Sequence, residues 1–152
     1  LEAAGVPGIA GVYVHHPMLI VVSIKQQYAG HARQAGMAVL ACGAGARNGR
    51  FVIVVDEDID PSNMDEVVWA MTTRVDPSVD IQTVLNCWAS PLDPRMPPEQ
   101  SDKGPHTNSR AVVYAVRPWE WREQFPAVNR IGRDQMAEVV KKYASVLPFP
   151  KR

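Results

Sequence analysis

The chain has 152 residues, of which 46% are hydrophobic and 21% are charged, which is the range of an ordinary soluble globular protein. Sixteen Lys and Arg residues balance 16 Asp and Glu residues, so the chain has no net charge with which to gather a nucleic acid or an anionic membrane surface. A chain of this length closes one sizeable core, and we expect a single domain over residues 1–152.

No segment is typical of membrane insertion or export. The longest apolar stretch, residues 18–24, is far too short to cross a bilayer, and no basic segment followed by an apolar one opens the chain. We therefore expect a cytoplasmic protein. Cys42 and Cys87 form no CxxC pair, which favours reduced thiols and predicts neither a disulfide nor a zinc site. Because the first residue is Leu1 and not Met, we expect this chain to be a piece of something longer.

The first third of the chain predicts strands that alternate with a helix. Residues 12–14 and 19–24 are short apolar runs, which indicate two tightly joined strands or one interrupted strand. Residues 29–42 are rich in small helix formers, with apolar residues three and four apart on a thin face. Residues 43–49 are glycine-rich and predict a turn. Residues 51–55 are all apolar, as in a strand that is buried on both faces of a parallel sheet.

The middle of the chain predicts a second helix and two further strands. After a turn at residues 56–61, Ser62 is the expected helix cap, with a carboxylate of the first turn reaching back to it. Asp76-Pro77 ends this helix, and residues 81–85 and 111–116 indicate strands. The expected apolar stripe of the helix consists of Val67, Val68 and Met71.

The segment between the last two strands, residues 86–110, contains five prolines and no periodicity, so we expect a loop or linker. A connection of this length inside a compact domain is either functional or disordered. Helices are predicted at residues 119–124 and 133–145. The fold class is therefore α/β, a three-layer domain with a mostly parallel or mixed central sheet flanked by helices. We expect residues 19–24, 51–55 and 81–85 in the centre of that sheet.

Lys25 is the first candidate site residue. It follows the strand of residues 19–24 at its carboxyl end, just before Gly30 and His31 open a helix. Ligands of open α/β sheets bind beyond the carboxyl ends of the strands, and a lysine beside a helix start can neutralise a phosphate. The alternative is that Lys25 is an ordinary solvated residue, and position alone favours this alternative slightly.

An acidic cluster follows the next buried strand, where residues 56–60 include four carboxylates. Such a cluster could bind a hard cation, but it lacks the spacing and the glycine of a calcium loop. Carboxylates in front of a helix are also favoured by its dipole, and Arg74 is a plausible partner for one of them. We therefore favour structural ion pairing and capping over a metal site.

Other motifs point to no chemistry. The glycines of residues 43–49 follow a helix and precede a strand, which is the reverse of a phosphate-binding loop. The histidines have no ligand spacing, and no serine or cysteine has the context of a nucleophile. We interpret Trp88, Trp119 and Trp121, with Leu92, Met96 and Phe125, as anchors of an oligomer interface, unless the proline-rich loop folds back over them.

Three blocks resemble the UbiD family of reversible decarboxylases in order and spacing. They are VSIKQQYAGHA at residues 22–32, FVIVVDEDIDP at residues 51–61 and VVWAMTTRVDP at residues 67–77. Looser similarity continues through SPLDP at residues 90–94 and TNSR at residues 107–110. The resemblance implies non-oxidative decarboxylation of aromatic, phenolic or heteroaromatic acids, with prenylated FMN, manganese and potassium as cofactors.

The part of the family that this chain resembles is the carboxy-terminal domain, which mediates oligomerisation and closes over the active site. The family's catalytic residues and metal ligands belong to earlier segments, so the resemblance assigns no catalytic residue and no metal ligand here. It carries over Lys25 to the cofactor phosphate, and Tyr28 and His31 to the lining of the substrate pocket. The implied partners are the amino-terminal flavin-binding part of the same protein, further copies of the chain and a small aromatic acid.

Two other interpretations remain. The chain could be a free-standing α/β module that binds a phosphorylated ligand through Lys25, or a purely structural oligomerisation domain that contacts no ligand. If the family resemblance holds, the parent protein is a carboxy-lyase, and we expect the isolated chain to be inactive and to bind no cofactor on its own.

Overall fold

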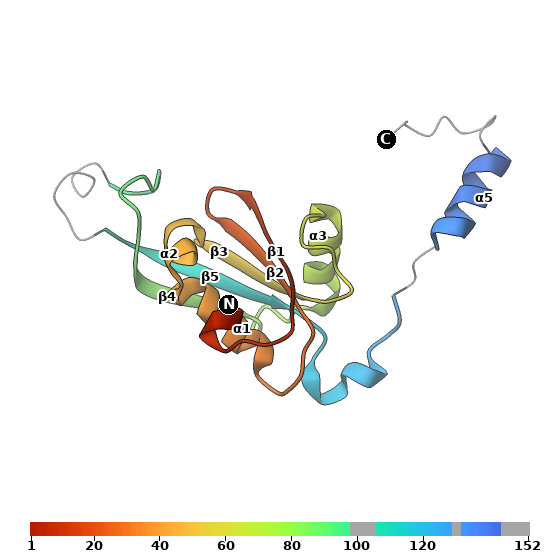
Figure 1. The fold of residues 1–152 in the computed structure, drawn as a ribbon, viewed down its shortest axis with the longest axis horizontal. Helices are drawn as coiled ribbons and strands as arrows, with labels where there is room; N and C mark the ends of the chain where they lie inside the picture. Colours follow the sequence, from red (N-terminus) through yellow and green to blue (C-terminus); the bar gives the residue numbers. More distant parts are fainter. Residues whose placement is uncertain (98–105, 129–131, 144–152) are drawn as a thin grey trace.

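Figure 1 shows the computed structural model, which describes residues 1–97, 106–128 and 132–143. Its centre is a five-stranded sheet with the strand order β1-β2-β3-β5-β4. β2, β3 and β5 are parallel to one another, whereas β1 and β4 lie antiparallel to their neighbours at the two edges. The strands are β1 (Ile9–His16), β2 (Leu19–Ile24), β3 (Phe51–Asp56), β4 (Ile81–Trp88) and β5 (Thr107–Ala115).

Helices cover both faces of this sheet, which confirms the predicted three-layer α/β fold with a mixed sheet. α1 packs on one face, where Ala32, Ala35 and Val39 form its predicted thin contact surface, and α3 packs on the other face. The helices are η1 (Glu2–Ala4), α1 (His31–Ala41), α2 (Gly43–Asn48), α3 (Met64–Arg74), the 3-10 helix η2 (Trp119–Gln124) and α5 (Arg133–Tyr143).

The parallel strands form the core because they are apolar on both faces. Val22 and Val54 face α1, whereas Val21 and Val55 face α3, and all four are fully buried. A strand with helices on both sides has no polar face, which explains the continuous apolar runs in the sequence. The central positions predicted for residues 19–24 and 51–55 are therefore confirmed.

The central position predicted for residues 81–85 is wrong. These residues belong to β4, which is an edge strand paired only with β5. Ile81 is 43% exposed and Leu85 is 66% exposed. The central place beside β3 is taken by β5, whose residues from Val112 onwards are all buried. β4 contains Gln82, Thr83 and Asn86, so it lacks the continuous apolar character of a strand that is buried on both faces.

The loop predicted at residues 86–110 is shorter than expected. β4 continues to Trp88 and β5 begins at Thr107, and these two ends pair with each other. Arg110 holds this corner, because its buried guanidinium donates hydrogen bonds to the carbonyl oxygens of Trp88 and of Gly45 and Ala46 in α2. Burial lowers the pKa of Arg110. Proline content therefore identified a loop but overestimated its length.

Two local predictions also need correction. Residues 43–49, predicted as a turn, contain α2, because the Cys42 sulfur accepts a hydrogen bond from the amide of Gly45 and caps the helix. α3 is capped by Asn63 and not by Ser62, whose hydroxyl donates to Asp60 instead. Both cysteines are free thiols.

The faces of the remaining helices differ from a simple apolar stripe. Of the stripe predicted for α3, Val67 is buried and Met71 packs partly buried against the core, but Val68 is 48% exposed. Ala70 and Arg74 are the other buried residues of this helix. In Figure 1, α5 lies apart from the sheet. Its predicted end at residues 144–145 lies outside the described residues. No helix among the described residues has the length and apolarity needed to span a bilayer.

We expect Gly45→Ala to destabilise the chain. A Cβ at Gly45 would overlap the carbonyl oxygen of Val39 in α1, and this backbone atom cannot rotate away. The predicted loss in the free energy of unfolding is about 2 kcal/mol or more. Gly43 lies in the same helix with open space around its Cβ position, so Gly43→Ala should leave stability unchanged or raise it by up to about 1 kcal/mol. Urea denaturation measures both variants, and equal losses would contradict the packing argument.

Candidate functional site

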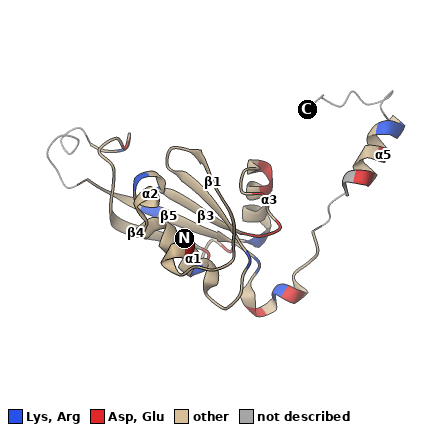
Figure 2. Cartoon of the chain, in the orientation of Figure 1, with Lys and Arg blue, Asp and Glu red and all other residues tan. Residues whose placement is uncertain are grey.

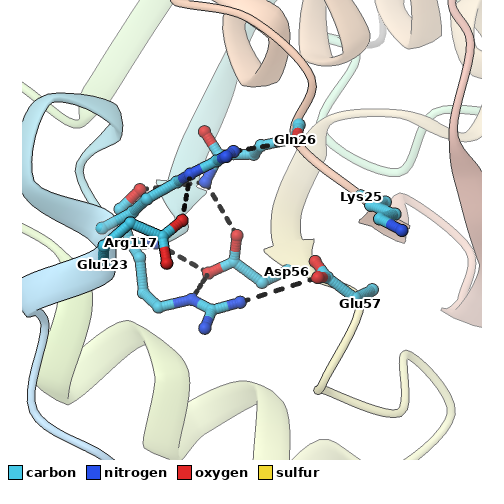
Figure 3. Close-up of a pocket in the computed structure, with 7 residues that line it drawn as sticks. Lys25, Gln26, Asp56, Glu57, Arg117 and Glu123 are labelled. Carbon is cyan, nitrogen blue, oxygen red and sulfur yellow. Dashed lines mark hydrogen bonds and ion pairs between the residues drawn. The ribbon is translucent and has the colours of Figure 1, made fainter.

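A charged pocket lies at the carboxyl edge of the sheet, where β2, β3 and β5 end. Figure 2 shows basic and acidic residues side by side there. The pocket has a volume of about 290 Å³. Figure 3 shows the side chains around it. The residues that line it are Lys25, Gln26, Asp56, Glu57, Arg117, Arg122 and Glu123.

Asp56, the last residue of β3, is the centre of this site. One carboxylate oxygen accepts hydrogen bonds from Arg74 Nη1 at 2.7 Å and from the backbone amide of Arg117 at 2.7 Å. The other oxygen accepts from Gln26 Nε2 at 2.8 Å. Asp56 is 1% exposed, so these donors replace the water that an ionised carboxylate requires. The carboxylate thereby joins the ends of three strands to α3.

Arg74 completes this network from the buried face of α3. Its side chain is fully buried and binds Asp58 through two nitrogens, at 3.0 and 2.8 Å, in addition to Asp56. Burial opposes the charge of Arg74, but the two carboxylates outweigh it and raise the pKa of Arg74. The acidic cluster is therefore an ion-pair network, and its predicted partner, Arg74, is confirmed.

The two arginines that line the pocket are also engaged. Arg117 Nε lies 3.3 Å from Asp56, and Arg117 Nη2 lies 3.8 Å from Glu57. Arg122 pairs with Glu123 at 3.0 Å, donates to the carbonyl oxygen of Gln26 and lies 4.0 Å above the ring of Trp119. These contacts neutralise most of the positive charge of the pocket within the chain.

Lys25 is the lining cation that makes no ion pair with the described residues. Its backbone amide donates to the carbonyl oxygen of Gly8 at 2.8 Å, which fixes the main chain at this point. Its side chain is exposed, and Figure 3 shows its amino group apart from the hydrogen-bonded network around Asp56. An anion at this edge therefore finds one cation whose charge is not already neutralised.

Tyr28 and His31, the other two candidate residues, stack on each other at 4.4 Å and are not among the residues that line this pocket. Tyr28 donates its hydroxyl hydrogen to Gln34. His31 is fully buried, and its Nδ1 accepts from the amide of Gln27. Its Nε2 therefore carries the proton and donates to the carbonyl oxygen of Pro7 at 3.0 Å. His31 thus holds the loop that carries Lys25 against the amino-terminal segment.

The sequence analysis did not select Gln26, Arg117 and Arg122 as site residues. Arg117 lies two residues after the end of β5, and Lys25 lies directly after β2, so the position of Arg117 after a strand was a usable signal. The signal was missed because residues 81–85 were placed in the centre of the sheet instead of β5. Arg122 lies in η2 and donates a hydrogen bond to the carbonyl oxygen of Gln26, which is 96 residues earlier in the chain. No local sequence pattern indicates such a contact.

The described residues offer no metal centre at this edge or elsewhere, because no group of three or more His, Cys, Asp and Glu side chains among them could hold an ion. The pocket has little apolar surface, and its three cations face three carboxylates. Among these three cations, Lys25 is the one that is not engaged by a carboxylate of the described residues.

Residues 2–115 match the family model described as the 3-octaprenyl-4-hydroxybenzoate carboxy-lyase C-terminal domain. The match covers most of the chain, and the chain belongs to this family, the UbiD carboxy-lyases, as their carboxy-terminal domain. The family resemblance found in the sequence is thus confirmed.

Particular relatives give the scale of the match. A phenolic acid decarboxylase of Sedimentibacter hydroxybenzoicus is 35% identical over 103 residues, which are 68% of this chain and 20% of that protein. The closed form of the vanillic acid decarboxylase of the same organism has a TM-score of 0.71 at 29% identity, covering 93% of this chain and 30% of that one. HmfF from Pelotomaculum thermopropionicum, solved with FMN, shares the fold with a TM-score of 0.71 at 23% identity, covering 89% of this chain and 30% of that one. The chain spans about a fifth of the length of the curated relatives it matches.

We expect Asp56→Asn to destabilise the fold strongly. The variant leaves the buried guanidinium of Arg74 without one of its two carboxylates and gives the Arg117 amide a poorer acceptor. Breaking a buried pair on one side costs about 3 kcal/mol. Thermal unfolding measures the loss, and Glu57→Gln, at a more exposed carboxylate of the same pocket, should cost less than about 1 kcal/mol. A loss of that small size for Asp56→Asn would contradict its central role.

Asp58→Asn should have a smaller effect that depends on pH. Partial burial raises the pKa of Asp58, but the hydrogen bonds and charge of Arg74, with that of Arg117, lower it below its ordinary value. Such a carboxyl stabilises the fold fully above its unfolded pKa of about 4, and the stabilisation disappears as the pH falls through the folded value. We expect a loss of about 1 kcal/mol at pH 7 that shrinks below about pH 4. Asp134→Asn, at an exposed carboxylate of α5, is the control, and a pH-independent loss for Asp58→Asn would contradict this account.

Proposed function

We propose that this chain is the carboxy-terminal, active-site-closing domain of a reversible non-oxidative decarboxylase of aromatic, phenolic or heteroaromatic acids. The observation that carries the proposal is the family match over residues 2–115. The two relatives from Sedimentibacter hydroxybenzoicus are decarboxylases of phenolic acids, which supports this substrate class. The reaction itself needs the amino-terminal flavin-binding part of the same protein, as the family resemblance implies.

The role proposed for Lys25 is to neutralise the phosphate of prenylated FMN. The pocket suits a phosphate group, because it has one cation without an ion pair among the described residues and few apolar walls. It does not suit the ring system, which we assign to the missing part of the protein. Prenylated FMN supplies the reactive centre for decarboxylation when it is bound. Manganese and potassium are also assigned to the amino-terminal part of the protein, because the family resemblance places the metal ligands in earlier segments.

Closure and assembly complete the proposal. The vanillic acid decarboxylase of Sedimentibacter hydroxybenzoicus has been solved in an open and a closed form, which supports a domain that moves over the active site.

Homo-oligomerisation of this domain in a cytoplasmic enzyme is the second part of the proposal. It is supported by large apolar groups that remain exposed, namely Trp88 (53%), Leu92 (86%) and Trp121 (45%). The proline-rich loop does not cover Trp88 or Leu92 with its described residues.

Lys25→Met in the full-length enzyme should weaken flavin binding. Hydrogen bonds to charged groups contribute about 1.5–3 kcal/mol, so we expect a loss of roughly tenfold or more in affinity for FMN. Flavin retained per subunit after gel filtration measures the effect. Lys25→Arg should keep most of the flavin, and Lys141→Met on α5 should keep all of it. Unchanged retention for Lys25→Met would contradict the assignment of Lys25.

The isolated 152-residue chain should not decarboxylate. Proton transfer in the family depends on carboxylates that match no residue here, and a lysine cannot replace them. The assay adds prenylated FMN, manganese and a panel of aromatic acids to the purified chain. Turnover above a buffer control would contradict the proposed division of labour. Tight binding of inorganic phosphate or FMN by the isolated chain would instead favour the free-standing phosphate-binding module.

A further inference from the structure

A second pocket lies at the opposite end of the parallel strands from the charged pocket. It has a volume of about 610 Å³, and its walls come from the start of β3, the start of β5, the end of β4 and the segment that follows β4. This volume is within the range of small-molecule sites. We call it the amino-end pocket. The side chains that matter for its chemistry are Arg50, Phe51, Asn86, Asp93, Arg95 and Met96.

Asp93 is the structural anchor of the amino-end pocket. It is 3% exposed, and one of its carboxylate oxygens accepts hydrogen bonds from the Arg50 guanidinium and from the backbone amide of Arg95, the latter at 2.8 Å. The other oxygen accepts from Asn108 Nδ2 at 2.7 Å. The charge of Asp93 is therefore compensated within the chain. Its bonds also fix the side chain of Arg50 and the main chain at Arg95 in the wall of the pocket.

Positive charge exceeds negative charge around this pocket. Arg110 lies behind Asn108, whose side-chain oxygen accepts from Arg110 Nε at 3.2 Å. Arg110 is 2% exposed, and its other hydrogen bonds go to carbonyl oxygens, so it pairs with no carboxylate of the described residues. The side chain of Arg95 is exposed and has no ion pair with the described residues either. Three arginines thus share Asp93 as their one described carboxylate, and an anion in the pocket would offset this excess.

The same pocket also has apolar surface and a free amide. Phe51 is 50% exposed, and Met96 lines the pocket with it. An aromatic ring packs favourably on a phenylalanine ring and on a methionine sulfur. Asn86 lies where the pairing of β4 with β5 is irregular, and its side chain makes no hydrogen bond with the described residues. The pocket therefore offers charge, an apolar surface and a polar group to one ligand.

These features select one class of ligand. A small inorganic anion would use the excess charge but leave Phe51 in water, whereas an uncharged ring would cover Phe51 and leave the excess charge as it is. A guanidinium binds a carboxylate through two parallel hydrogen bonds, which is a stronger contact than one between neutral groups. We infer that the amino-end pocket binds an aromatic carboxylate, whose carboxylate group pairs with Arg95 and whose ring packs on Phe51 and Met96.

This inference is independent of the role proposed for Lys25. It uses residues at the other end of the strands, and it requires neither FMN nor decarboxylation. Its test measures binding of an acid to the 152-residue chain, whereas the test of Lys25 measures flavin retained by the full-length enzyme. Either proposal can therefore fail without the other.

The experiment titrates benzoate into the ¹⁵N-labelled 152-residue chain and follows the backbone amides by NMR at constant ionic strength. We expect a dissociation constant of about 1 mM or tighter, which a ligand of this size can reach. The amides of Asn86, Arg95 and Asn108 should shift. Arg95→Met should weaken binding at least tenfold. Arg47→Met, at an exposed arginine of α2 that does not line the pocket, is the matched control and should change the affinity less than twofold.

Two further probes separate charge from ring. Benzamide keeps the ring without the charge, and acetate keeps the charge without the ring, so each should bind at least tenfold more weakly than benzoate. Acetate binding as tightly as benzoate would overturn the inference, because it indicates a site for any small anion. Equal affinity in Arg95→Met and the unchanged chain would also overturn it. So would shifts confined to Lys25 and Gln26, or no shift at about 10 mM benzoate, ten times the expected dissociation constant.

Discussion

The buried carboxylate of Asp56 is the interaction on which the carboxyl edge of the sheet depends. It accepts hydrogen bonds from Gln26 after β2, from Arg117 after β5 and from Arg74 on α3. Asp56 and Arg74 are both shielded from water, so the attraction between them offsets the free-energy cost of burying each one as an ion. The ends of the three strands are thereby fixed relative to one another by the ion pair of Asp56 with Arg74 and by the other hydrogen bonds that Asp56 accepts, and not by apolar packing alone.

This arrangement determines which charge remains available for a ligand. Arg74 and Arg117 are committed to carboxylates, and Lys25 is left at the rim. The main chain around Lys25 is held on two sides, by the hydrogen bond from Gln26 to Asp56 and by that from Gln27 to His31. A flexible side chain thus starts from a fixed backbone position. Such a lysine can meet an anion brought by another domain without a rearrangement of the sheet.

The sequence predicted what depends on local pattern and missed what depends on distant partners. The apolar runs of β2 and β3 identified two central strands, because burial on both faces leaves no polar residue. β4 was placed in the centre as well although it contains Gln82 and Thr83, and its pairing with β5 alone, far along the chain, determines that it lies at the edge. The same error hid Arg117, since a residue after a strand can be assigned to the site only when that strand's place in the sheet is known. The ion pair between Asp56 and Arg74 was predictable because one helix separates the two residues.

β3 shows why the two ends of the sheet can serve different purposes. It begins at Phe51, which is half exposed, and ends at Asp56, which is buried in the charged network. The four residues between them are apolar and fully packed, so neither end offers the other a polar connection. The charges at the carboxyl end are paired within the chain, whereas the apolar surface at the amino end is not covered by the described residues. A change in the apolar surface at the amino end of β3 should therefore leave the charged pocket intact. A change at Asp56 should disturb the whole sheet, because three strands end there.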